Sequence, residues 1–102
     1  MMEMLTIVVY DITEDKIRNK IADRCKDYGL ERFQFSAFIG WLNQNKREEL
    51  FLNLCSLLEK SEGSIWLFPI CHKDQEQIKI WRTIKNQQGK IEILTQSPIL
   101  TE

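Results

Sequence analysis

Asp11 is the residue whose type and position best suit chemistry, because it directly follows the apolar run of residues 5–10, LTIVVY. A carboxylate at the end of a buried strand is held rigidly, and Mg²⁺ or another hard divalent cation prefers such oxygen ligands. One carboxylate alone makes a poor metal site, but a two-fold dimer would bring a second Asp11 to the same place. Two carboxylates around a metal could activate water for attack on a phosphate. Alternatively, Asp11 only opens the turn before a helix.

Three further side chains could act beside Asp11. Arg18 flanks the apolar stripe of the first expected helix and could lean back over the strand end. Arg32 begins the second expected strand, where its partner is either a phosphate or a carboxylate such as Glu31. Phe38 interrupts a polar face and could stack on a nucleic-acid base, or belong to the core or to a dimer interface.

Composition limits the class of protein. The chain has 102 residues, 43% hydrophobic and 28% charged, which is typical of one globular domain. No apolar run reaches the roughly 18 residues of a membrane span, so we expect a cytoplasmic protein without a membrane partner. The net charge of −1 means that any nucleic-acid surface must be a local one. Three cysteines in apolar contexts are expected to be buried thiols, with a metal role for Cys71-His72 as the alternative.

The first half of the chain predicts a strand, a helix and a second strand. Residues 5–10 suit a central strand buried on both faces. Thr13 or Asp15 can cap the following helix, whose apolar stripe is spaced by four, four and three residues and ends before Gly29. The stripe consists of Ile17, Ile21, Cys25 and Tyr28. Residues 30–42 alternate as in a long strand, with a bend expected near Gly40 and a third strand after it.

A second helix is expected over residues 47–60, with inward leucines at positions 50, 54, 57 and 58. A strand follows over residues 65–70, where Pro69 indicates a sheet edge or the last residues of the strand. The order β-α-β-β-α-β predicts an α+β fold of the ferredoxin-like, split βαβ type. The domain is expected to cover residues 1–85, with residues 86–102 as a C-terminal extension.

Residues 77–85 form a further alternating segment, with Ile78, Ile80 and Ile84 on one face and Trp81 on the other. This strand needs a sheet edge to pair with, and the sheet of a second copy is one candidate. A homodimer with an exchanged strand is therefore one of the arrangements open at this point. Residues 90–94 could form one more short strand or fray.

The sequence resembles the CRISPR-associated endoribonuclease family, the small dimeric partner of the CRISPR integrase in spacer acquisition. The resemblance covers about residues 5–85, in order and at the family's spacings. It rests on residues 8–12 (VVYDI), a basic helix with Arg18, residues 28–42 (YGLERFQFSAFIGWL), an amphipathic second helix and residues 64–71 (SIWLFPIC). Residues 28–40 are its most specific part.

This resemblance implies a homodimer in which Asp11 is the catalytic, metal-binding aspartate at the dimer interface, with Mg²⁺ or another hard divalent cation as cofactor. It implies that the exchanged C-terminal strand carries interface residues: Ile78, Ile80, Trp81 and Ile84. Polar and aromatic positions near the site carry over as nucleic-acid-binding or site-flanking residues: Tyr10, Arg18, Lys20, Arg32, Ser36 and Phe38. Lys20 stands where the family often has arginine, which keeps the charge but loses bidentate phosphate geometry.

The implied partners are integrase dimers, which the family bridges, and nucleic acid, either duplex DNA or single-stranded RNA. Three functions remain open at this point. The chain could be a metal-dependent endonuclease of CRISPR adaptation, a non-catalytic DNA-binding scaffold in the same process, or a toxin-type endoribonuclease of the same fold. A small-molecule regulatory domain is disfavoured, because the sequence has no glycine-rich ligand loop.

Overall fold

The computed structural model describes residues 2–83 and 91–94. The chain divides into two compact units, the first ending at Ile70 and the second beginning at Cys71. Each unit is described below by itself. Among the described residues, no helix is both long and apolar enough to cross a membrane.

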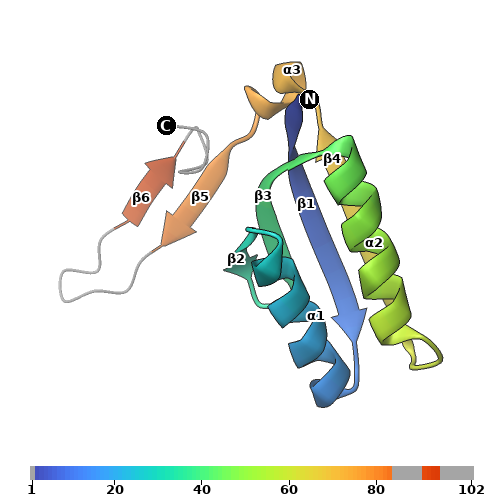
Figure 1. Ribbon diagram of the computed structural model, residues 1–102. Helices are drawn as coiled ribbons and strands as arrows, with labels where there is room; N and C mark the ends of the chain where they lie inside the picture. Colours follow the sequence, from blue (N-terminus) through green and yellow to red (C-terminus); the bar gives the residue numbers. More distant parts are fainter. Residues whose placement is uncertain (1, 84–90, 95–102) are drawn as a thin grey trace. The chain divides into compact units, whose positions relative to one another are not determined.

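The first unit is a four-stranded antiparallel sheet covered by two helices on one face (Figure 1). The sheet order is β2-β3-β1-β4, so β1 is central and β4 is an edge strand, as Pro69 indicated. The elements are β1 Glu3–Ile12, α1 Asp15–Asp27, β2 Glu31–Gln34, β3 Ala37–Asn43, α2 Gln44–Leu58 and β4 Gly63–Ile70. This is the predicted ferredoxin-like, split βαβ arrangement.

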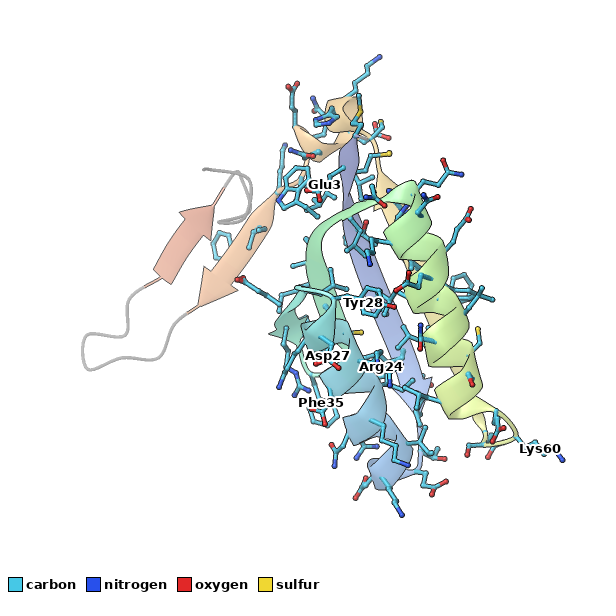
Figure 2. All side chains as sticks on the ribbon, viewed as in Figure 1. Glu3, Arg24, Asp27, Tyr28, Phe35 and Lys60 are labelled. Carbon is cyan, nitrogen blue, oxygen red and sulfur yellow. The ribbon has the colours of Figure 1, made fainter. Side chains whose placement is uncertain are left out.

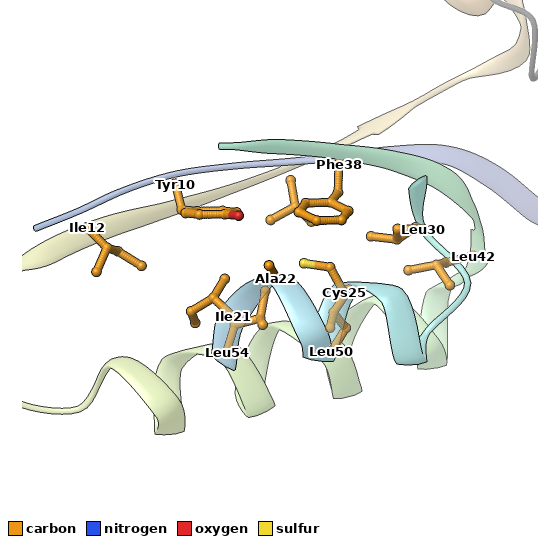
Figure 3. Close-up of a cluster of buried hydrophobic side chains, with 11 residues drawn as sticks. Tyr10, Ile12, Ile21, Ala22, Cys25, Leu30, Phe38, Leu42, Leu50 and Leu54 are labelled. Atoms are coloured by element: carbon orange, nitrogen blue, oxygen red, sulfur yellow. The ribbon is translucent and has the colours of Figure 1, made fainter. Parts of the chain in front are cut away.

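The core lies between the sheet and the helices (Figure 3). Every second residue of β1 points toward the helices, because side chains alternate along a strand. The predicted apolar stripes of both helices meet these strand residues. The buried cluster consists of Val8, Tyr10, Ile12, Ile21, Ala22, Cys25, Leu30, Phe38, Leu42, Leu50 and Leu54.

Helix α1 ends where predicted but begins differently. Gly29 adopts a φ of +86°. Its N–H donates to the Lys26 carbonyl, and the N–H of Leu30 donates to the Cys25 carbonyl. These two hydrogen bonds form a Schellman motif. At the other end the capping residue is Glu14, which makes no side-chain capping hydrogen bond. The prediction of Thr13 or Asp15 as the cap was therefore wrong.

The long strand predicted over residues 30–42 is instead the hairpin of β2 and β3, with its turn at Phe35 and Ser36. The bend was expected near Gly40 on the basis of glycine alone, but the turn begins five residues earlier, at Phe35. Gly40 has a packing role: a Cβ there would lie 2.6 Å from Leu30 Cδ2 and 3.1 Å from Leu30 Cα. The hairpin contains a register shift between Arg32 and Gln34, which makes β2 a short, irregular edge.

The face of the sheet that lies away from the helices is apolar and partly exposed. Pairing of β1 with β4 places Ile7 opposite Phe68 and Val9 opposite Trp66. The Trp66 and Phe68 rings stack with centroids 6.0 Å apart, and these side chains are 59% and 43% exposed. We call Ile7, Val9, Trp66 and Phe68 the open sheet face. The expectation that β1 is buried on both faces was wrong for this chain alone.

The second unit contains a short helix and a two-stranded antiparallel sheet. The helix α3 His72–Gln75 was not predicted, whereas the strands β5 Ile80–Thr83 and β6 Ile91–Leu94 fall within predicted strand segments. Ile80 pairs with Leu94 and Thr83 with Ile91. Strand β5 is shorter than the predicted 77–85, and Ile84 lies outside the described residues. Exchange of this strand between two copies stays a prediction.

The cysteines differ from their predicted burial. Cys25 is fully buried in the core, and burial raises the pKa of its thiol to about 12, so it stays a protonated core thiol. Cys55 and Cys71 are both exposed. The expectation of three buried thiols was therefore wrong for two of them.

Candidate functional site

Asp11 lies near the end of β1 and is exposed. It is two residues beyond Val9, so its side chain lies on the open sheet face. Its cross-strand neighbour on β4 is Ser64, which is also exposed. The polar pair Asp11 and Ser64 thus lies next to the apolar pair Val9 and Trp66 on this face.

The donors at this end fit a hard cation in kind but not in number. Asp11 offers carboxylate oxygens and Ser64 a hydroxyl oxygen, and both are ligand types that Mg²⁺ accepts. Among residues 2–83 and 91–94, no three His, Cys, Asp or Glu side chains are grouped closely enough to hold a metal ion. The described part of one chain therefore forms no metal site by itself, and a cation bound at Asp11 would need further ligands from a second copy, water or substrate.

Arg18 leans back toward the end of β1, as expected from its position on α1. Its Nη1 donates to the carbonyl oxygen of Ile12 at 2.9 Å, and its Nη2 is paired with Asp15. Its guanidinium also lies over the Phe35 ring, 5.5 Å from the ring centre. Arg18 is therefore held at the end of β1 by the Ile12 carbonyl, by its own helix and by the hairpin turn.

The other predicted polar residues lie around the same hairpin and helix. Arg32 is exposed on β2, with its guanidinium 5.2 Å from the centre of the Phe38 ring. It makes no ion pair with any described residue, so the carboxylate partner expected as one alternative is not found there. Lys20 is exposed on α1. Ser36 is half-buried, and its carbonyl accepts a hydrogen bond from the Tyr10 N–H at 3.0 Å.

Two of the predicted site residues belong to the core. Phe38 is fully buried and Tyr10 is 2% exposed, and their rings stack with centroids 6.3 Å apart. A base cannot stack on the buried Phe38, so the core alternative holds for this residue. Burial raises the pKa of Tyr10, while Arg32 and Arg18 act in the opposite direction. Tyr10 is thus a neutral phenol beneath the site, with no surface to offer a substrate.

The Tyr10 hydroxyl is buried and has no hydrogen-bond partner among the described residues. A buried, unsatisfied hydroxyl costs roughly 1–3 kcal/mol, so Tyr10→Phe is expected to raise the free energy of unfolding by about 1 kcal/mol. Urea denaturation followed by circular dichroism measures this. A clear loss of stability would mean that the hydroxyl has a partner, such as a bound water, that the variant leaves unsatisfied.

Sequence reasoning missed Phe35. The alternation over residues 30–42 assigned it to a strand face, whereas it stands in the hairpin turn and is 70% exposed. Figure 2 shows it at the end of the hairpin, beside α1. No local signal marked its exposure, because a large aromatic between two polar residues, Gln34 and Ser36, is also the pattern of a half-buried strand.

The fold and the site define a ferredoxin-like α+β domain with an exposed carboxylate near the end of its central strand and an arginine fixed at the last carbonyl of that strand. The family model for CRISPR associated protein Cas2 matches residues 4–78. The chain belongs to this Cas2 family of CRISPR-associated proteins.

Individual relatives agree with the family model. A CRISPR-associated endoribonuclease Cas2 from Desulforudis audaxviator is 48% identical over 71 residues, which are 70% of this chain and 67% of the relative. A second, from Pyrobaculum aerophilum, is 42% identical over 67 residues, covering 66% and 74% of the two chains. The crystal structure of a hypothetical protein from Thermus thermophilus superposes with a TM-score of 0.62 at 33% identity. It covers 68% of this chain and 83% of that one.

A further relative is a fusion protein. The CRISPR-associated endonuclease Cas1/endonuclease Cas2 fusion of Thermoproteus tenax is 39% identical over 69 residues. This match covers 68% of the present chain but only 26% of the fusion. In that protein, a Cas2 portion and a Cas1 portion share one polypeptide.

Proposed function

We propose that the chain is a homodimeric, metal-dependent endonuclease of CRISPR adaptation that acts in the cytoplasm. In this role it binds nucleic acid and bridges integrase dimers during spacer acquisition. The observation that carries the proposal is the placement of Asp11: an exposed carboxylate at the end of a central strand, on the open sheet face. The names of the relatives support nuclease activity in the family.

Dimerisation is supported by the apolar surface that the sheet exposes. Val9, Trp66 and Phe68 lie side by side on the open sheet face, and such a surface is costly to leave in water. A groove of about 700 Å³ also runs between α2 and β4, with Phe51, Leu52 and Trp66 among its lining residues. In the proposed dimer, two open sheet faces meet, and segment 77–85 of each copy pairs along the β4 edge of the other.

In the proposed dimer the two-fold axis passes near the Asp11 end of each open sheet face, which brings the two Asp11 carboxylates together. The two Asp11 side chains, with Ser64 nearby, would hold Mg²⁺ or another hard divalent cation. Such an ion, when bound, supplies an activated water and neutralises charge that develops on a phosphate. Arg18 and Arg32 would bind the phosphates that flank the cleaved one, because guanidinium groups pair well with phosphate oxygens.

An integrase as partner is supported by the fusion protein of Thermoproteus tenax. Two proteins that occur as one polypeptide in one organism commonly assemble as separate chains in another. We therefore propose that the dimer holds two integrase dimers apart and carries the incoming DNA between them.

The second candidate is a non-catalytic DNA-binding scaffold in the same assembly. It is favoured by the lack of an acidic cluster among the described residues, since Asp11 is a single carboxylate per chain. A scaffold would keep the dimer and the arginines but would not need a bound metal.

Cleavage assays on the wild-type protein separate the two candidates. Single-stranded RNA and duplex DNA are each incubated with the protein in Mg²⁺ and in excess EDTA. The endonuclease proposal expects cleavage of at least one substrate in Mg²⁺ and none in EDTA. Binding without cleavage of either substrate would support the scaffold, whereas cleavage in EDTA would contradict a metal-dependent centre.

A further inference from the structure

Phe35 is a large aromatic side chain that the fold holds in the open rather than in the core. It occupies the turn between β2 and β3 and is 70% exposed. A guanidinium within about 6 Å of an aromatic ring centre is attracted to the face of the ring, and Arg18 meets this criterion at 5.5 Å. Arg18 is itself anchored to the Ile12 carbonyl, so the ring and the cation form one fixed unit.

This unit lies beside the Asp11 end of β1. The Tyr10 N–H donates a hydrogen bond to the Ser36 carbonyl oxygen. Because Tyr10 precedes Asp11 and Ser36 follows Phe35, this bond links β1 to the hairpin turn. Arg18 makes a second link, because it contacts both Ile12 and Phe35. The exposed Phe35 ring and the Arg18 cation are therefore tied to the backbone on both sides of Asp11, at the end of β1.

The pairing of ring and cation indicates which ligand fits. A purely apolar protein surface over Phe35 would remove water from the Arg18 guanidinium without replacing its hydrogen bonds, which is costly. A nucleotide offers both groups that are needed: a flat base for the ring and a phosphate for the guanidinium. Arg18 has five N–H donors and uses two groups, Nη1 and Nη2, in its contacts with Ile12 and Asp15, so donors remain for a phosphate.

We infer that Phe35 is a stacking platform for an unpaired nucleobase, with Arg18 binding the adjoining phosphate, so that the strand is held at the end of β1. This inference rests on the proposed function and adds a positioning residue and a preference to it. Bases in a blunt duplex are already stacked on each other, so the platform favours single-stranded nucleic acid.

The test uses the full chain and two labelled probes, a single-stranded RNA of 12 nucleotides and a blunt duplex DNA of about the same length. Affinities are measured by fluorescence anisotropy in EDTA, so that the strands stay intact, and at several salt concentrations. The variants are Phe35→Leu, which keeps an apolar side chain without a ring, and Phe35→Tyr, which keeps the ring. Phe33→Leu is the matched control, since Phe33 is a second exposed aromatic on β2.

Phe35→Leu is expected to weaken binding of the single strand about tenfold or more, the usual effect of losing one base–aromatic stack. Its slope of log affinity against log salt should equal that of wild type, because no charge is lost. Duplex binding should change little, and Phe35→Tyr should restore single-strand binding. Phe33→Leu should behave as wild type.

Several results would overturn the inference. Unchanged single-strand affinity in Phe35→Leu would show that no base stacks there, and an equal loss in Phe33→Leu would indicate a general apolar effect. Dissociation of the dimer in Phe35→Leu, seen by sedimentation, would assign the ring to a protein interface. If wild type binds neither probe, the proposed nucleic-acid function itself fails, a result distinct from a failure confined to the Phe35 variant.

Discussion

Replacing Asp11 with asparagine is expected to abolish Mg²⁺-dependent cleavage while leaving the fold and the dimer intact. The amide has the shape of the carboxylate but no charge, so it is a poor ligand for a hard cation. Asp11 is exposed and lies at a strand end, so its replacement disturbs no core contact. Loss of metal-assisted catalysis, which contributes several kcal/mol, lowers the cleavage rate by about a hundredfold or more.

Asp23→Asn is the matched control for this experiment. Asp23 is an exposed aspartate on α1, so its replacement removes the same charge without altering the open sheet face. Cleavage rates, thermal melting and sedimentation are compared for the three proteins. Cleavage that survives in Asp11→Asn would place the active centre elsewhere. Spacer integration by Asp11→Asn together with the integrase, without any cleavage, would support the scaffold.

Placing an arginine at Phe68 is expected to convert the dimer to monomer. Phe68 is 43% exposed on the open sheet face, opposite Ile7. If two such faces meet, Phe68→Arg buries an unpaired charge from each copy. An uncompensated buried charge costs several kcal/mol, which weakens dimerisation by about a hundredfold or more. Sedimentation velocity at several protein concentrations measures this directly.

Ser56→Arg adds the same charge to an exposed position on α2 and should leave the dimer unchanged. Circular dichroism of both variants shows whether each still folds. A Phe68→Arg protein that remains a dimer would mean that the open sheet face is not the interface. Monomeric protein from both variants would instead show a general effect of charge on association.

Alternation along residues 30–42 predicted strand structure correctly but placed the turn incorrectly. Turn predictions from sequence rely on glycine, proline, asparagine, aspartate and, more weakly, serine, and of these only serine occurs at Phe35 and Ser36. The bend was expected near Gly40 because glycine is common in bends. In the structure, glycine is needed there because Leu30 packs too closely to leave room for a Cβ. Phe38 was hard to assign because residues 30–42 were predicted as a single strand. On that strand the other residues on the face of Phe38 are mostly polar.

The parts of the site that follow from local geometry were predictable. Asp11 near the end of an apolar strand and Arg18 leaning back toward that strand end both follow from the strand and helix periods of the first 28 residues. The open sheet face was not predictable from the sequence. When all the residues of a strand are apolar, the sequence does not show whether one face of the strand or both faces are covered. Phe35 was missed because its exposure depends on where the hairpin turns.

The two edges of the sheet differ in a way that bears on polymerisation. Edge β2 has four residues and a register shift, so it offers little continuous backbone to a further strand. Edge β4 has eight residues, but Pro69 near its end lacks an N–H group. A sheet with one receptive edge and one poor edge cannot propagate strand addition in both directions. Fibre growth through the sheet of the first unit would require two receptive edges, so this asymmetry disfavours amyloid-like growth through that sheet.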